Sequence, residues 1–148
     1  MRVSTRVEYG LMALADIALH SENGGSVSTT EVAVRQKISQ KYLEQILPLL
    51  RQAGLIKAQK GLRGGYRLSK SSDKISIADV LNALDDSILA EMEIPEEEED
   101  GVLRGCINEC LWGKINKKLS DYAKSVTLAE FLNECREKNT EEWDLYVI

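Results

Sequence analysis

The sequence of 148 residues contains little of what catalysis or a membrane span would require. It has a single histidine, His20, and no apolar run close to the roughly 20 residues that cross a bilayer as a helix. One histidine provides no nucleophile–base pair. The glycines at 61–65 lie between two strand-like runs, whereas a phosphate-binding loop precedes a helix. We therefore expect neither an enzyme nor a membrane protein.

Cysteine and aromatic residues are also few. The three cysteines, Cys106, Cys110 and Cys135, all lie in the second half of the chain, and an odd number does not indicate a disulfide framework. The first residues lead directly into a polar amphipathic pattern rather than a signal peptide, which indicates a cytoplasmic protein. With one phenylalanine in the chain, the core is expected to consist mainly of leucine, isoleucine, valine and alanine.

Charge is distributed unevenly along the chain. The total is −5, but residues 1–90 hold 12 basic and nine acidic side chains, and residues 91–148 hold seven and 15. Residues 35–74 alone hold ten basic and two acidic side chains, a net charge of +8. Because counterion release on DNA depends on local charge, this stretch indicates a nucleic-acid-binding surface in spite of the acidic total.

Helical patterns with capping signals occupy the first third of the chain. Ser4 is the expected N-cap of a helix whose apolar residues recur at helical spacing. A capping box at 28–31 predicts a second, short helix, residues 37–39 predict a turn, and Ser39 predicts the start of a third helix. Pro48 interrupts the third pattern, and we expect a bend or early fraying there.

A glycine-rich turn follows the third helix and predicts a hairpin. Residues 60–65 separate two short strand-like runs, 55–59 and 66–69, and a second capping box at 76–79 predicts another helix. Helix, helix, turn, helix and hairpin is the order of a winged helix-turn-helix. The expected fold class is therefore mainly α, with a winged helix-turn-helix DNA-binding domain and a long C-terminal dimerisation helix.

The second half of the chain begins with an acidic run. Five acids at 96–100 predict a flexible linker over residues 91–106, after a DNA-binding domain at 1–90. In the remaining unit, 107–148, apolar residues recur at the spacing of a coiled-coil seam, which predicts a dimerisation helix over about 108–125. A third capping box at 127–130 predicts a last helix. The seam residues are Trp112, Ile115, Leu119 and Tyr122.

The third helix and the hairpin carry the candidate DNA-binding residues. The first residues of a recognition helix reach base edges in the major groove, where glutamine suits adenine, lysine guanine and glutamate cytosine. Base contacts are expected from Ser39, Gln40, Lys41, Glu44 and Gln45. In the wing, basic side chains would meet the backbone or the minor groove, and glycines with positive φ would allow close approach. These wing residues are Lys60, Arg63 and Arg67, with Gly61, Gly64 and Gly65. There are two alternatives. The three helices and the hairpin display only a solvated face, or the chain is an interaction module that does not bind DNA.

Four motifs resemble the Rrf2 family of winged-helix repressors, over nearly the whole chain. They are Ser-Thr-Arg-x-x-Tyr-Gly-Leu at 4–11, Tyr-Leu-Glu-Gln at 42–45, Arg-x-Ala-Gly-Leu-Ile at 51–56 and Lys-Gly-x-x-Gly-Gly-Tyr at 60–66. The resemblance implies a repressor that binds a pseudo-palindromic operator in double-stranded DNA as a homodimer with exchanged C-terminal helices. It also implies that Glu44 and its neighbours read bases and that the wing from Lys60 to Tyr66 touches the minor groove. Phosphate contacts are implied for Ser4, Thr5 and Tyr9.

The cysteines bear on which subgroup of this family the chain resembles. Cluster-binding members carry three spaced cysteines before the dimer helix, whereas here the acidic run replaces the first two and Cys106 lies at the third. A cluster takes about four ligands, of which Cys106 and Cys110 could supply two, with Glu109 or a second protomer adding others. Because this motif is incomplete, no cofactor is expected and an iron–sulfur cluster is the alternative. In the other interpretation Cys110 is a packing residue and Cys106 a free thiol, which could sense redox state.

The tail resembles that of the family's cysteine-metabolism repressors. The resemblance implies that the apolar end, with Tyr146 and Ile148, inserts into cysteine synthase, a mode in which a terminal carboxylate and an apolar side chain are recognised together. Packing of residues 145–148 onto the domain is the alternative. The main expectation is a repressor of cysteine or sulfur metabolism with cysteine synthase as a partner. The alternative is an iron–sulfur-cluster or redox-sensing regulator that uses Cys106 and Cys110.

Overall fold

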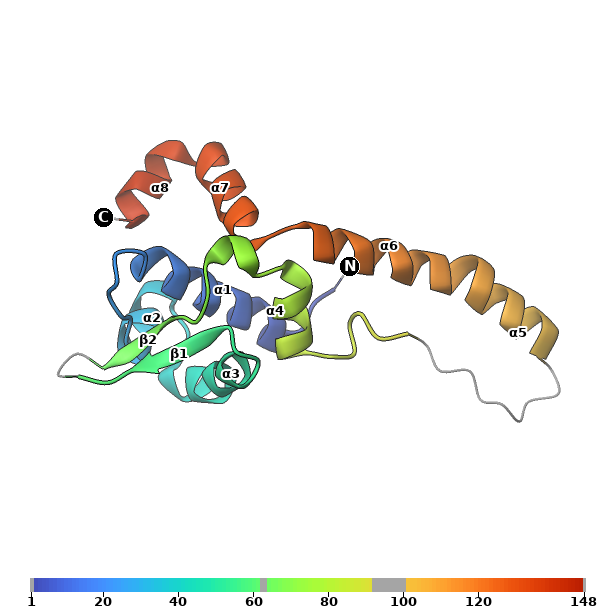
Figure 1. Ribbon diagram of the computed structural model, residues 1–148, viewed down its shortest axis with the longest axis horizontal. Coiled ribbons are helices and arrows are strands. Elements are labelled where there is room, and N and C mark those ends of the chain that lie inside the picture. The colour runs from blue at the N-terminus through green and yellow to red at the C-terminus, as the bar shows by residue number, and fades with distance from the viewer. Residues whose placement is uncertain (1, 62–63, 92–100, 148) are drawn as a thin grey trace.

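Packed helices and a hairpin form the body of the molecule (Figure 1). The computed structural model describes residues 2–61, 64–91 and 101–147, with the backbone alone for 144–147. The body contains α1 (Thr5–His20), α2 (Thr29–Gln36) and α3 (Gln40–Gln52), followed by a hairpin of β1 (Ile56–Gln59) and β2 (Gly65–Leu68). One hydrophobic core joins these elements, with Leu14, Leu43 and Ile56 at most 1% exposed. This is the predicted mainly α winged helix-turn-helix.

Each helix of the body begins at its predicted cap. Ser4 Oγ accepts a hydrogen bond from the backbone N–H three residues later at 3.3 Å, and Ser39 Oγ does the same at 3.1 Å. The capping box of Ser28 and Glu31 is complete. Lys37, with φ 56°, ends α2 in the left-handed conformation and forms the predicted turn. These side chains provide partners for backbone N–H groups that a helix start otherwise leaves unbonded.

Pro48 does not end α3. We predicted a bend or early fraying at this residue, but the helix continues to Gln52, so the prediction of fraying was wrong. Leu47 and Leu50, on either side of the proline, are 2% and 0% exposed. An interior proline costs a helix about 3 kcal/mol, and the burial of two leucines is of similar size. Packing against the body therefore holds the last turn.

The hairpin is anchored to the segment before α2 as well as to α3. Its strands pair antiparallel, with Ile56 opposite Leu68 and Ala58 opposite Tyr66. Val27 adds an isolated bridge to Tyr66, through backbone hydrogen bonds of 2.8 and 2.7 Å. The wing is thereby fixed relative to the start of α2.

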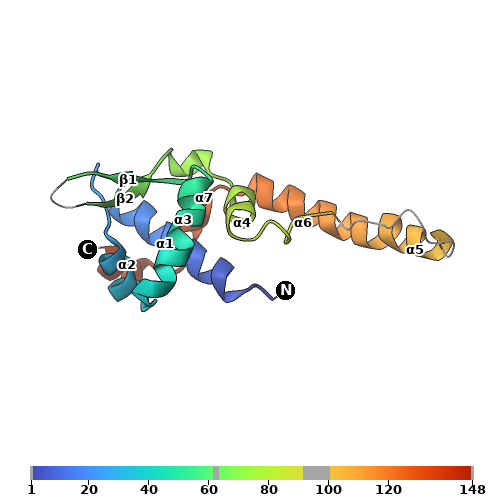
Figure 2. The same ribbon diagram turned by 90° about the horizontal axis from the view of Figure 1, so that it is seen from below.

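A long helical rod projects from the body (Figure 1 and Figure 2). After the 3-10 turn η1 (Ser72–Lys74) and α4 (Ile77–Leu84), the rod consists of α5 (Gly101–Ile107), a π-helical turn η2 (Asn108–Trp112) and α6 (Gly113–Ser125). The predicted linker reached residue 106, and this boundary was wrong, because the helix already begins at Gly101. Residues 101–107 contain one charged side chain, Arg104, so the repulsion within the acidic run does not extend to them. The run itself, 96–100, lies outside the described residues. No helix in the described part of the chain has both the length and the apolar character that a membrane span needs.

After the rod the chain returns to the body. Two backbone hydrogen bonds of 2.8 and 2.9 Å join the start of α4 to the start of α7 (Leu128–Lys138), around an isolated bridge between Ser76 and Thr127. Leu128 and Leu132 belong to the same core as α1 and α3, and α8 (Thr140–Val147) follows α7. The predicted unit 107–148 therefore divides, since the rod stands outside the body and α7 packs within it.

Candidate nucleic-acid interface

The recognition helix presents its predicted base-reading residues together. α3 buries one apolar face against the body, which fixes the opposite face outward; the buried residues are Leu43, Ile46, Leu47 and Leu50. The exposed residues at its start are Ser39, Gln40, Lys41, Glu44 and Gln45. Amide, ammonium and carboxylate groups thus lie at the end of a helix that fits the major groove, which is the chemistry that base edges require.

Ser39 fixes where the recognition helix begins. Its hydroxyl oxygen accepts the hydrogen bond from Tyr42 N–H, and its backbone is extended, as at an N-cap. A cap of this kind stabilises a helix by about 1 kcal/mol. The cap also determines which side chains occupy the first turn of α3.

Two tyrosines connect α1 to this first turn. Tyr9 and Tyr42 are half-buried, and their ring centroids lie 5.6 Å apart at an interplanar angle of 88°. An edge-to-face pair of this geometry contributes roughly 0.5–1.5 kcal/mol beyond its buried area. Tyr9 is thereby held beside α3, while Ser4 and Thr5 are exposed at the start of α1. Sequence reasoning gave Tyr42 no role, because pairing between two helices leaves no periodic signal.

The wing fully exposes some predicted contact residues and partly covers others. Lys60 and Gly64 are exposed, and Arg67 is half-buried. Tyr66 is also half-buried and packs against the core, so it supports the wing from within the protein. Arg63 lies outside the described residues.

Only one of the wing glycines has the predicted positive φ. Gly61 has φ 150°, whereas Gly64 and Gly65 do not have positive φ, so the prediction was wrong for these two. A β-carbon on Gly65 would lie 2.6 Å from the carbonyl carbon and oxygen of Val27, because the bridge brings the two backbones together. Close approach within the protein therefore requires glycine at 65.

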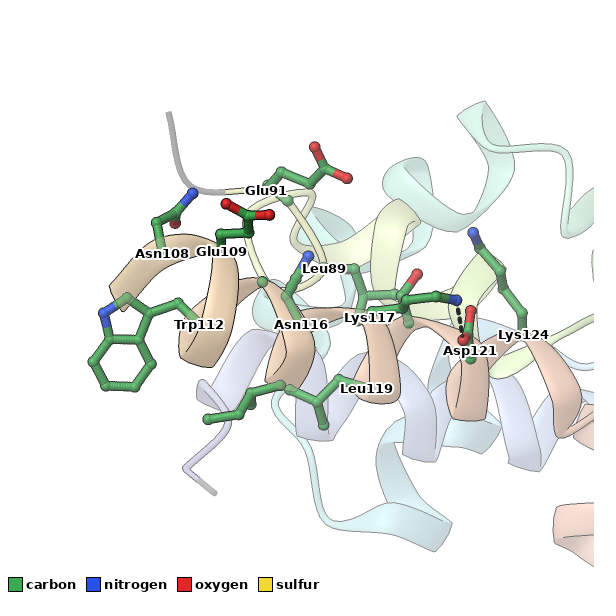
Figure 3. A pocket seen from close by; sticks show the side chains of 14 residues that line it. Leu89, Glu91, Asn108, Glu109, Trp112, Asn116, Lys117, Leu119, Asp121 and Lys124 are labelled. Carbon is green, nitrogen blue, oxygen red and sulfur yellow. Dashed lines mark hydrogen bonds and ion pairs between the residues drawn. The ribbon is translucent and has the colours of Figure 1, made fainter. Parts of the chain in front are cut away.

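A groove of about 880 Å³ lies between residues 89–91 and the rod (Figure 3). Glu91 and Glu109 lie toward one end, and Lys117 Nζ contacts Asp121 Oδ2 at 2.7 Å toward the other. The hydrogen bond from Lys117 lowers the pKa of the Asp121 carboxyl below its usual value. Three predicted seam residues also line the groove: Trp112, Ile115 and Leu119.

The candidate metal ligands Cys106 and Cys110 lie close together along the rod, in α5 and η2, and both are exposed. The interpretation of Cys110 as a packing residue is therefore wrong for a single chain. Among the described residues, no three histidine, cysteine, aspartate or glutamate side chains come together as a metal site. Since a cluster takes about four ligands, the described residues of one chain do not fit it by themselves. Cys135 is half-buried in α7, and His20 ends α1.

Comparison with known sequences identifies the family. Residues 3–134 match the family model Rrf2, described as an iron-dependent transcriptional regulator. The HTH-type transcriptional regulator IscR of Erwinia tasmaniensis is 37% identical over 133 residues, which cover 90% of this chain and 79% of that protein. IscR of Photobacterium profundum is 34% identical over 142 residues, covering 96% of this chain and 80% of that protein. These relatives are transcriptional regulators and not enzymes.

Solved structures agree with this assignment. CymR, described as the global cysteine regulator of B. subtilis, has a TM-score of 0.75 at 30% identity, covering 90% of this chain and 98% of that one. T. potens IscR has a TM-score of 0.74 at 31% identity, covering 93% and 90%. The motifs, the winged-helix body and these matches agree: the chain belongs to the Rrf2 family of winged-helix transcriptional regulators.

Proposed function

We propose that the protein is a sequence-specific DNA-binding regulator that acts as a homodimer and responds to iron or redox state through Cys106 and Cys110. The observation that carries the proposal is the recognition helix. α3 is capped, packs one face on the body, and exposes Gln40, Lys41 and Glu44 on the other. A helix held in this way places its first side chains at the base edges of a major groove.

The charge around α3 supports binding to phosphates. Residues 35–74 carry a net charge of +8, and Lys41, Lys57 and Lys60 are all exposed. Each lysine that pairs with a phosphate releases counterions from DNA, so affinity follows the local charge and falls as salt rises. The net charge of −5 therefore does not oppose DNA binding at this face.

The rod supports the homodimer. In a single chain it exposes a series of large apolar side chains to solvent, between 38% and 86% of each. Exposed apolar surface of this extent marks an interaction site, and helices with such a seam associate along it. The exposed residues are Val102, Leu103, Ile107, Leu111, Trp112, Ile115, Leu119 and Tyr122.

The π-helical turn keeps much of this apolar series on one side of the rod. From Leu103 to Leu119 an apolar residue recurs at every fourth position. In a continuous α-helix, with 3.6 residues per turn, four such steps drift by about 160° around the axis. Gly113 N–H donates to Asn108 C=O, an i→i+5 hydrogen bond that makes the turn wider. The wider turn accommodates about one extra residue, which offsets roughly 100° of the drift around the axis. A second rod can then lie along one face.

The sensing part is supported by the comparisons and by the exposure of the two thiols. The family model is described as iron-dependent, and two curated relatives are named IscR. Cys106 and Cys110 are exposed on the rod, and each is next in sequence to a residue of the exposed apolar series. Because one chain does not complete a ligand set, a cluster would need further ligands, for example from a second copy. Reversible oxidation of the thiols requires no further ligand.

Selection from a random duplex library tests the DNA-binding part. The wild-type protein should enrich a palindromic motif. The double variant Lys41→Ala/Glu44→Ala should lose its preference for that motif by about tenfold or more, because each base contact contributes about 1–3 kcal/mol. The matched control, Lys117→Ala/Asp121→Ala, removes the same two charges from an exposed pair on the rod. An unchanged footprint of the first variant on a dimeric protein would contradict the assignment of α3.

Anaerobic purification tests the sensing part. Iron content is measured per chain, and affinity for the selected duplex is measured before and after treatment with peroxide. Cys106→Ser and Cys110→Ser should abolish the iron content or the response to peroxide. Cys135→Ser, in α7, is the matched control. An iron-free wild-type protein whose DNA affinity does not respond to peroxide would contradict this part of the proposal.

A second candidate function is repression of cysteine or sulfur metabolism, with cysteine synthase as a partner. The likeness to the B. subtilis global cysteine regulator favours it. Tyr146 belongs to α8, but its side chain and the whole of Ile148 lie outside the described residues. Deleting residues 145–148 should abolish a complex with purified cysteine synthase. A complex retained by the truncated protein would count against an insertion of the tail.

A further inference from the structure

A buried carboxylate joins α1 to the end of α2. Asp16 is 0% exposed, and no other polar or charged side chain among the described residues is as deeply buried. Its Oδ2 accepts hydrogen bonds from Arg35 Nε at 2.9 Å and Gln36 Nε2 at 2.8 Å, and its Oδ1 accepts from Arg35 Nη2 at 2.8 Å. His20 Nδ1 lies 3.6 Å from Oδ1. A two-point contact between arginine and a carboxylate fixes orientation as well as distance.

These contacts lie where the recognition helix is set up. Arg35 and Gln36 are the last two residues of α2, and the next residue, Lys37, takes the left-handed conformation that ends the helix. Two residues later Ser39 caps α3. With so short a turn, the direction in which α3 leaves depends on how the last turn of α2 sits on α1.

We propose that Asp16 is a positioning residue for DNA recognition. By holding the last turn of α2, its carboxylate sets the direction of α3 and hence the alignment of the base-reading side chains in the major groove. The inference rests on the proposed DNA-binding function and deepens it. Asp16 acts through Arg35 and Gln36, since its own side chain is buried beneath the surface.

The reason for a carboxylate at this position is directional. An apolar side chain could hold α1 against α2 by area alone, and buried ion pairs are often no more stabilising than apolar replacements. Three oriented donors on one carboxylate instead select a single angle between the helices. Base-edge hydrogen bonds weaken steeply when their angle changes. The electrostatic attraction to phosphates, which carries most non-specific binding, is much less directional.

The test compares the affinity for the duplex selected by the wild-type protein with that for a scrambled duplex of the same length. Asp16→Asn keeps the size of the side chain and removes its charge. The ratio of the two affinities should fall by about tenfold or more, which is the loss of one base contact. A smaller folded fraction lowers both affinities by the same factor and leaves the ratio unchanged. Asp121→Asn, in the exposed pair on the rod, is the matched control and should keep the ratio within about twofold of wild type.

Two milder variants keep the test decisive if Asp16→Asn does not fold. Arg35→Lys preserves the positive charge without the two-point contact, and Gln36→Met removes one hydrogen bond. Both should lower the ratio in the same direction, Arg35→Lys by about threefold or more. Ratios equal to wild type in folded, dimeric variants would overturn the positioning role. If the wild-type protein selects no duplex at all, the proposed function fails, and this inference with it.

Discussion

At the residue scale, the wing depends on the absence of one side chain. The backbone of Val27 approaches Gly65 so closely that a β-carbon would lie 2.6 Å from it. Neither segment can move apart without breaking the two hydrogen bonds between Val27 and Tyr66, each contributing about 1 kcal/mol. The wing and the segment before α2 therefore behave as one structural unit.

Gly65→Ala should therefore destabilise the protein. Overpacking of this kind lowers the free energy of unfolding by roughly 1–3 kcal/mol. Gly64→Ala is the matched control, because a β-carbon there would be 3.6 Å from its nearest neighbours, an ordinary contact, and the change should stay within about 0.5 kcal/mol. Urea denaturation measures the free energy of unfolding of both variants at one protein concentration, since the stability of a dimer depends on concentration. Equal stabilities of the two variants would show that the Val27 segment moves aside for the new β-carbon without a cost in free energy.

The same scale shows which contacts can be predicted from a single sequence. The caps Ser4, Ser28 and Ser39 were predicted because their hydrogen-bond partners lie three residues along the chain. The contact of Asp16 was not predicted, since its partner Arg35 is 19 residues away and no periodicity links the two. The contact between Tyr42 and Tyr9 was missed for the same reason. Local contacts leave a signal in the sequence, whereas contacts between elements do not.

At the element scale, the starts of helices with a side-chain cap were predictable, whereas helix extents and the uncapped start of the rod at Gly101 were not. α2, α4 and α7 all begin at predicted capping boxes. The extent of α3 beyond Pro48 depends on burial of its last turn, and the place of α7 depends on Leu128 and Leu132 entering a core formed by distant residues. The rod extends the predicted seam at its N-terminal end, where α5 and the π-helical turn precede α6. In the proposed homodimer, that extension would lengthen the interface beyond the predicted seam of four residues.

Leu103→Glu should therefore weaken the dimer, although Leu103 lies outside the predicted seam. A carboxylate buried in an apolar interface is strongly unfavourable, and we expect the dimer dissociation constant to rise by about tenfold or more. Val34→Glu is the matched control, because Val34 is 73% exposed on α2 and Leu103 is 71% exposed on α5. Sedimentation equilibrium measures the dimer dissociation constants of the two variants, and Leu119→Glu is the reference for a residue of the predicted seam. If Leu119→Glu dissociates the dimer and Leu103→Glu does not, the interface is confined to α6.

At the scale of the whole molecule, charge is separated along the chain. The basic stretch 35–74 includes the recognition helix and the wing, whereas residues 91–148 carry a net charge of −8. A protein charged in this way is attracted to DNA by one part and repelled by the other. The separation therefore favours encounters in which the winged-helix face meets the duplex.

The salt dependence of DNA affinity should consequently depend on where a charge lies. Lys60→Ala removes an exposed lysine from the wing, and the slope of log affinity against log salt should become shallower by about one for each phosphate that the wing no longer neutralises. Lys138→Ala removes an exposed lysine from α7, where it pairs with Glu134 at 3.4 Å, and should leave the slope unchanged. Both variants alter the total charge equally, and filter binding or fluorescence anisotropy over a salt series measures both slopes. Equal changes in slope would mean that DNA responds to the total charge of the molecule, and the wing would then make no phosphate contact through Lys60.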